Sequence, residues 1–356
     1  MNRRTFLLAI GATACGAKRP PKPPHKRRRG DPIDDDDNDS GGDAPRPTRP
    51  DRGDVWGLPP TRPYWYRLAT HDERLAQRRE TELRLWDLRT MRRTDTLATA
   101  YHDACFLADG RLAALHDMGS SPYPELHLID PRGAIDVRTG QSMMVDTDTE
   151  LLPADSGDAI YVTEHSDLVY RADLGGGHFQ FVDVLKVADR DPLTSLGDGR
   201  LVTTANHGAL RVLAFGKPEL RLKTPAWPIL IAPLAGSRAW LTLLYPDAFG
   251  AQILLLIRLV DPLVTEARID VSPGRIFDLA TAGGAAAVIV DTQGRTAWER
   301  AIVVYEENGK ERWRVSAPVH GRAHLAMSKE RVVYSLNDGT LLAWDAATGA
   351  AVAVTT

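Results

Sequence analysis

Short apolar runs alternate with tight polar turns along the chain from residue 54 onwards. The runs are rich in Val, Leu, Ile and Tyr and are short enough for β-strands, and no long stretch shows helical periodicity. Many turns carry Asp-Gly or Gly-Gly pairs, as in "ADGR" at 108–111 and "GDGR" at 197–200, which supply the positive φ that tight hairpins need. The pattern therefore predicts an all-β protein built from hairpins.

This alternation repeats along the chain. Each unit contains an apolar run, a tight turn, a second strand, a loop, a third strand that ends in Asp or a substitute, and a more polar fourth strand. The third strands end 39 to 45 residues apart, at Asp87, Asp130, Asp173, Gly216, Asp261, Glu306 and Asp345. Four antiparallel strands per unit at this period predict a β-propeller over residues 54–356. We expect seven blades, with six or eight as the alternatives.

The last two units resemble a known propeller repeat. In the final unit a "DG" pair leads into "TLLAWDAATG" at 340–349, which is similar to the PQQ-type repeat. "VVYEENGKERWRV" at 303–315 has Gly309 and Trp313 in matching places, whereas "LRLWDLRTMR" at 83–92 resembles the WD type. The resemblance implies PQQ-like or WD-like blades, and it specifies the blade rather than any chemistry.

Each residue of this motif has a structural role to fill. We expect Gly339 to permit the hairpin and Gly349 to adopt the left-handed conformation. The carboxylate of Asp345 should accept hydrogen bonds from backbone N–H groups of the next turn. Trp313 and Trp344 should fill the space between neighbouring sheets. The motif therefore gives no reason to place catalysis at these positions.

The first fifteen residues, "MNRRTFLLAIGATAC", differ from the rest. A basic start precedes an apolar run that is too short to span a bilayer, which predicts a signal peptide over residues 1–14. Arg3 and Arg4 lie in "RRTFLL", which resembles the twin-arginine export signal, and general export is the alternative. "ATAC" resembles a lipobox, although Ala12 stands where Leu is usual. We therefore expect Cys15 to carry a lipid anchor.

Residues 16–53 have a composition that cannot form a core. They contain eight Pro, ten Lys or Arg and eight Asp, but only three apolar residues. We expect residues 15–53 to be a lipidated, disordered tether whose basic block, "KRPPKPPHKRRR", is drawn to anionic lipid headgroups. The acidic run "DPIDDDDND" is interpreted as a solvated spacer, since a Ca²⁺ site needs ligands held in a fixed turn. The remainder carries a net charge of −7 without a basic stripe, so nucleic acid is not an expected partner.

The sequence shows no pattern that predicts catalysis, a metal or a cofactor. Quinoprotein enzymes with similar propellers use Ca²⁺, a Trp platform and often adjacent cysteines, whereas Cys15 and Cys105 are the two cysteines of this chain. We expect Cys105 to be a buried small hydrophobe. His320 and His324 are four residues apart, but a Gly lies between them and the segment runs into a strand, so no metal site is predicted there.

Long loops between the second and third strands distinguish units 2, 5 and 6. They contain "HDMGSSPYPE", "YPDAFGAQ" and "DTQGRTAWER", against three residues in unit 7. Loops on rigid scaffolds carry specificity, and aromatic residues and Arg often anchor protein interfaces. The candidate interaction residues are Tyr123, Tyr245, Phe249, Arg295, Trp298 and Arg300. The alternative is that these rings pack on their own blades.

Three functions are compatible with this organisation. The favoured one is a non-catalytic envelope lipoprotein that binds a protein partner, and it has a fold-level resemblance to the lipidated propeller of the outer-membrane β-barrel assembly machinery. Gly16 follows the Cys, with no Asp to favour inner-membrane retention, so an outer-membrane location is expected. The alternatives are a PQQ-like quinoprotein enzyme and a sensor that binds a small ligand in the central channel.

Overall fold

The computed structural model describes residues 67–116, 123–141, 143, 145, 149–164, 168–187, 193–205, 208–245, 251–271, 273–294, 297–319, 323–336 and 338–355. The chain divides into two units, 1–49 and 50–356, and every described residue belongs to the second. Each regular element in these ranges is a β-strand, and the strands form seven four-stranded antiparallel sheets. Within the same ranges, no helix has the length and apolar character that a membrane crossing requires. The predicted all-β, seven-bladed propeller is confirmed.

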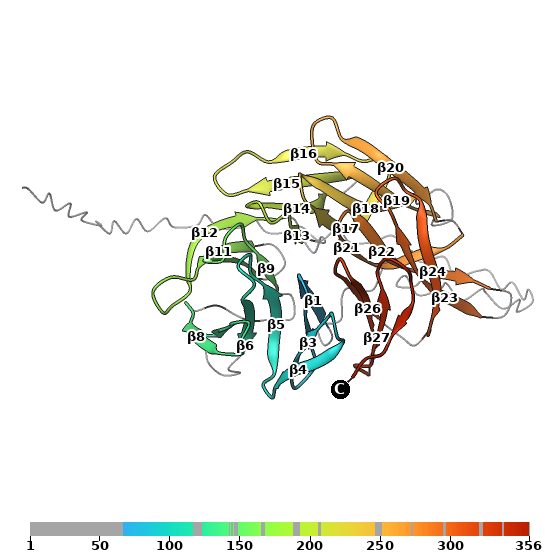
Figure 1. The fold of residues 1–356 in the computed structure, drawn as a ribbon. Helices are drawn as coiled ribbons and strands as arrows, with labels where there is room; N and C mark the ends of the chain where they lie inside the picture. Colours follow the sequence, from blue (N-terminus) through green and yellow to red (C-terminus); the bar gives the residue numbers. More distant parts are fainter. Residues whose placement is uncertain are drawn as a thin grey trace, which may run out of the picture. The chain divides into compact units, whose positions relative to one another are not determined.

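Each blade contains four consecutive strands (Figure 1). The strands of blades 1 and 2 are β1 (Arg67–His71), β2 (Arg74–Arg78), β3 (Leu83–Asp87), β4 (Arg92–Leu97), β5 (Tyr101–Phe106), β6 (Leu112–His116), β7 (Glu125–Ile129) and β8 (Ile135–Thr139). Those of blades 3 and 4 are β9 (Leu151–Pro153), β10 (Ala159–Glu164), β11 (Leu168–Asp173), β12 (Gln180–Lys186), β13 (Leu193–Ser195), β14 (Arg200–Ala205), β15 (Ala209–Ala214) and β16 (Leu220–Lys223).

The last three blades are built in the same way. The strands of blades 5 and 6 are β17 (Trp227–Leu234), β18 (Arg238–Tyr245), β19 (Ala251–Arg258), β20 (Val264–Asp270), β21 (Arg275–Ala282), β22 (Ala285–Gln293), β23 (Trp298–Tyr305) and β24 (Glu311–Ala317). Those of blade 7 are β25 (His324–Met327), β26 (Arg331–Ser335), β27 (Leu341–Asp345) and β28 (Ala351–Val352). The third strands β3, β7, β11, β15, β19, β23 and β27 end at or just before the seven repeat positions predicted from the sequence.

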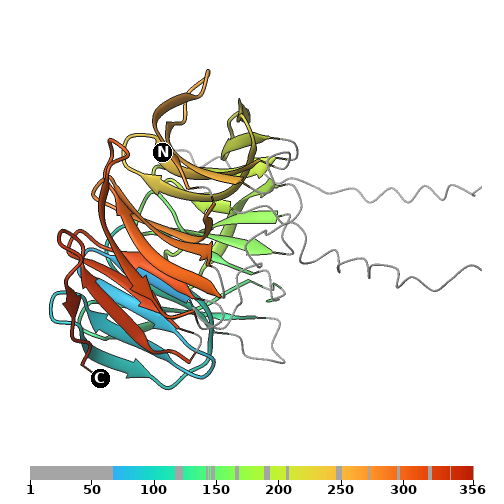
Figure 2. The same cartoon turned by 90° about the vertical axis from the view of Figure 1, so that its right-hand side faces the viewer.

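The blades close into a ring. The first strand of each blade contacts the first strand of the next, and β25 returns to β1. The blue strands of blade 1 and the red strands of blade 7 accordingly lie side by side in both views (Figures 1 and 2). Thr355 exchanges backbone hydrogen bonds with Met91 and Arg93, and the buried amide of Gln77 donates to the carbonyl of Gly339 over 2.9 Å. These bonds join the end of the chain to its first blade.

Apolar side chains fill the spaces between blades, as the face-to-face packing of sheets requires. Trp313 and Trp344 lie in one buried cluster with residues of blades 6 and 7, which confirms their predicted role. The indole Nε1 of Trp313 donates to the carbonyl of Ala346 over 3.0 Å. Cys105 is buried in the cluster between blades 2 and 3, also as predicted.

The turn chemistry of the repeat is also confirmed. Asp345 Oδ1 accepts hydrogen bonds from the hydroxyl of Thr348 and from the backbone N–H groups of Thr348 and Ala347, and these bonds hold the pKa of Asp345 below its ordinary value. Gly339 and Gly349 have φ values of 82° and 73°, where a side chain would be strained. The repeat motif therefore maintains the blade.

Candidate functional site

The antiparallel order of the strands gathers two kinds of connection on one face of the ring. First and third strands begin there, and second and fourth strands end there. This face therefore carries the long connections of blades 2 and 5 as well as the connections between blades. We call it the loop face, and its described apolar residues with large exposure are Tyr123, Trp227, Trp298 and Val319, with Tyr245 half-buried beside them.

Two neighbouring blades contribute most of these side chains. Trp227 begins β17 and pairs with Leu244, so it lies next to Tyr245 at the end of β18. Trp298 begins β23 in the next blade, where the guanidinium of Arg275 lies 5.7 Å from its ring centroid. Tyr245 packs partly on the core of its own blade, as the alternative interpretation of these rings expected. Trp227 and Trp298 are 41% and 42% exposed, large fractions for indole rings.

Arg300 differs from its predicted place in a loop. The unit-6 segment "DTQGRTAWER" is mostly strand, because β22 runs to Gln293, β23 starts at Trp298 and these two residues pair. Arg300 is buried on β23, with Nε 2.6 Å from Asp291 Oδ1 and Nη2 2.7 Å from Oδ2. Its buried guanidinium is therefore part of the structure between blades 6 and 7 and no surface anchor.

Of the other predicted site residues, the structure describes one. Tyr123 is 51% exposed just before β7, as expected for a loop-face residue. Phe249, Arg295, Cys15, Arg3 and Arg4 lie outside the described residues.

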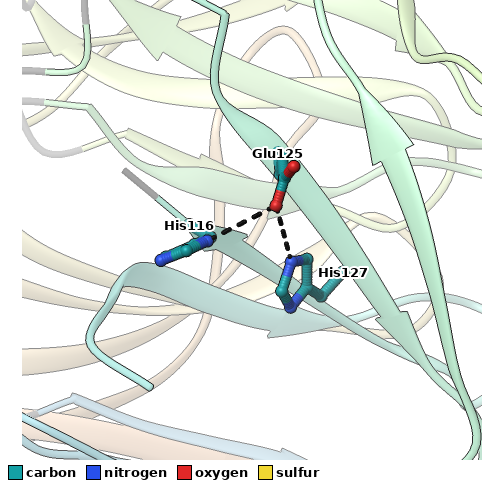
Figure 3. A group of neighbouring side chains, drawn as sticks. All are labelled: His116, Glu125 and His127. Atoms are coloured by element: carbon teal, nitrogen blue, oxygen red, sulfur yellow. Dashed lines mark hydrogen bonds and ion pairs between the residues drawn. The ribbon is translucent and has the colours of Figure 1, made fainter. Parts of the chain in front are cut away.

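A cluster of two imidazoles and a carboxylate lies on the two central strands of blade 2, at the end of the blade that belongs to the loop face (Figure 3). His116 ends β6 and Glu125 begins β7, and the two are register partners across the hairpin. His127 lies two residues further along β7, so its side chain shares the face of Glu125. Glu125 Oε2 lies 3.5 Å from His116 Nδ1 and 3.2 Å from His127 Nε2. The three side chains converge on one point between them.

A tyrosine extends the cluster into the blade. Tyr101 is the register partner of His116 on β5, and its hydroxyl lies 2.8 Å from Nδ1 of His127. Burial raises the pKa of Tyr101, so the phenol stays protonated at neutral pH. The hydrogen bond from His127 lowers the pKa of Glu125, so this side chain is a carboxylate there. The cluster therefore combines one negative charge with two imidazoles, a donor set that transition-metal sites use.

Sequence reasoning missed this cluster, although the signal was present. His116 and Glu125 are the first and last residues of "HDMGSSPYPE", which drew attention for its length and its tyrosine. A hairpin that places these two residues opposite each other also places His127 beside them, because alternate residues of a strand share a face. The strand register is the information that the sequence lacked.

Comparisons with known proteins bear on the fold. No family model and no curated protein matches the chain. Among solved structures, Hsv2 from Kluyveromyces lactis superposes with a TM-score of 0.58 at 12% identity, over 79% of this chain and 92% of that one. The β-propeller domain of Cps50 (Swd1) from Myceliophteria thermophila gives 0.54 at 12% identity, over 78% and 93%. Sqt1 from Saccharomyces cerevisiae gives 0.52 at 12% identity, over 80% and 83%. At this identity the likeness shows the fold alone, and the fold is a WD-like seven-bladed β-propeller.

Proposed function

We propose that this protein is a non-catalytic scaffold that binds a protein partner through the loop face of its propeller. The observation that carries the proposal is the exposure of Trp227 and Trp298 on that face of two adjacent blades. Aromatic side chains and Arg dominate the binding energy of protein interfaces, and Trp298 stands beside Arg275. The WD-like fold supports the same class of function at the level of architecture.

The rigidity of the ring favours binding by a preformed surface. Both indoles project from the first residue of a strand whose later residues are mostly buried and paired with the neighbouring strands. A partner therefore meets side chains whose backbone is already ordered, which lowers the entropy lost on binding. The opposite face offers Val260 in the connection from β19 to β20, an aliphatic residue with similar exposure, followed by exposed Val264 at the start of β20 and, among the described residues of this connection, by no exposed aromatic ring.

Site-specific photo-crosslinking in cells tests this proposal. A photoreactive amino acid at position 298 is expected to capture a defined protein, whereas the same amino acid at position 260 should not. Trp298→Ala should then weaken binding of that purified partner by about 2 kcal/mol, or roughly 30-fold, while Val260→Ala leaves the affinity unchanged. Equal capture from both positions would argue against a loop-face interface.

We also propose that the scaffold is held at the cell envelope by a lipid on Cys15, with the outer membrane as the favoured location. The basis is the sequence alone: Arg3 and Arg4 before an apolar run that stops at this cysteine. A radiolabelled fatty acid should be incorporated into the wild-type protein and not into Cys15→Ser, which should leave the membrane fraction. Equal labelling of the two proteins, or Cys15→Ser that stays membrane-bound, would contradict the anchor.

A further inference from the structure

We propose that His116, Glu125 and His127 form a binding site for one divalent transition-metal ion, with Zn²⁺ as the best-matched ion. The ligand atoms are Nδ1 of His116, an Oε of Glu125 and Nε2 of His127. The site lies at the base of the hairpin that carries Tyr123. It is independent of the proposed protein-binding function, and either can hold without the other.

The distances suit an ion at the centre of the cluster. Zn²⁺ binds imidazole nitrogen and carboxylate oxygen at about 2.0–2.2 Å, so tetrahedral ligands lie about 3.3–3.6 Å from one another. The distances from Glu125 Oε2 to the nitrogens of His116 and His127 are 3.5 and 3.2 Å, and all three ligand atoms lie within 4.8 Å of one another. The two distances to Glu125 therefore already suit a tetrahedral ion, and binding requires only that the two imidazoles also approach each other to about 3.6 Å.

One ligand atom lacks a hydrogen bond in the described structure. Nδ1 of His116 is buried and makes none, and its nearest partner, Glu125 Oε2, is at the long distance of 3.5 Å. A buried nitrogen without a hydrogen bond is unfavourable, so a network of hydrogen bonds alone leaves the cluster incomplete. A bound ion would satisfy this lone pair directly.

The hydrogen bond between Tyr101 and His127 also supports a metal site. When Nε2 of an imidazole binds a metal, Nδ1 carries the proton and usually donates it to an oxygen that fixes the ring. The Tyr101 hydroxyl lies 2.8 Å from Nδ1 of His127 and can accept that proton. The ring is thus oriented by a residue on the neighbouring strand.

The type of donor narrows the choice of ion. Ca²⁺ and Mg²⁺ prefer ligand sets made of oxygen, whereas two imidazoles and one carboxylate suit Zn²⁺ and neighbouring transition metals. Three protein ligands leave at least one coordination position for water or for a side chain of a partner. A bound ion would cross-link the end of β6 to the start of β7, the two strands joined by the connection that contains Tyr123.

Metal titration of the purified full chain tests the site. Protein without a polyhistidine tag, stripped with a chelator, is titrated with Zn²⁺ by calorimetry and with Co²⁺ by visible absorption. We expect one equivalent of each ion to bind, with a Co²⁺ band of the intensity that four- or five-coordinate nitrogen–oxygen sites give. Absence of the Co²⁺ band in the wild-type protein would overturn the proposal, and this result needs no variant to fold.

Variants locate the ion. Removal of a hydrogen-bond partner behind a ligand lowers metal affinity about 10- to 100-fold, so Tyr101→Phe should bind about 10-fold more weakly. Loss of a ligand should have a larger effect, so Glu125→Gln and His127→Gln should bind at least about 100-fold more weakly. His178→Gln removes an exposed imidazole in blade 3 and should bind as the wild type does. Circular dichroism confirms that each variant is folded, and wild-type affinity in Glu125→Gln would place the ion elsewhere.

Discussion

Asp291→Ala is expected to lower the free energy of unfolding by about 3–5 kcal/mol, because it removes the carboxylate that pairs with the buried guanidinium of Arg300. The pair is bidentate, with N–O distances of 2.6 and 2.7 Å, and both residues are less than 10% exposed. Arg300 also donates to the hydroxyl of Tyr334, which in turn donates to the carbonyl of Pro318. The network thus ties blade 6 to blade 7.

The charge on Arg300 cannot be relieved by loss of its proton. Burial lowers the pKa of Arg300, but the hydrogen bonds with Asp291 and Tyr334 outweigh this effect and raise the pKa above its ordinary value. Asp291→Ala removes the carboxylate that supplies most of this effect, but a guanidinium keeps its proton at neutral pH regardless. Arg300 therefore remains a buried cation without its carboxylate, which is the costly state. Asp291→Ala should therefore lower the free energy of unfolding by more than the loss of an exposed ion pair does.

Urea denaturation followed by tryptophan fluorescence measures the effect of Asp291→Ala. Glu311→Ala, which removes the exposed partner of Arg314, serves as a control and should change stability by less than about 1 kcal/mol. The double variant Asp291→Leu/Arg300→Met should recover most of the lost stability, since it replaces both charges with apolar groups of similar volume. If Asp291→Ala and Glu311→Ala lowered the free energy of unfolding by similar amounts, burial would not be what makes the Asp291–Arg300 pair important for stability.

Strand order was predictable from the sequence because the repeat encodes it locally. A third strand that ends in Asp and a following turn are set by neighbouring residues, and Asp345 caps its turn as expected. The position of Arg300 was not predictable in the same way. "DTQGRTAWER" lacks a clear apolar pattern. The side chain of Arg300 is covered by Phe277, in the first strand of the same blade, and by Tyr334, in the next blade.

One of the two candidate sites could be predicted from the sequence, and the other could not. The exposure of Trp298 follows from its position at the start of a strand and could be predicted from a loop-like segment. The cluster of His116, Glu125 and His127 depends on which residues face each other across β6 and β7. A shift of one residue in that register would send the side chains to opposite faces of the blade. The register between these two strands, which the sequence did not specify, is therefore what brings the cluster together.

Trp240→Ala is expected to lower the free energy of unfolding by about 3–5 kcal/mol, the second large effect that the structure predicts. Trp240 is fully buried on β18, in the cluster that joins blade 5 to blade 6. Its Nε1 donates to the carbonyl of Gly284, in the turn just before β22 of the next blade, over 3.1 Å. Truncation removes both the apolar contacts and this bond, and the two rigid sheets can collapse only partly into the space.

Phenylalanine variants separate the hydrogen bond of Trp240 from its packing. Trp86 is similarly buried between blades 7 and 1, but its Nε1 makes no hydrogen bond in the described structure. Trp240→Phe leaves the Gly284 carbonyl without its donor, whereas Trp86→Phe removes a buried donor that has no acceptor. Trp240→Phe should therefore destabilise the protein by about 1 kcal/mol more than Trp86→Phe in the same urea titration. An equal or larger loss for Trp86→Phe would show that ring volume alone, and not the bond between blades, sets the contribution of these tryptophans.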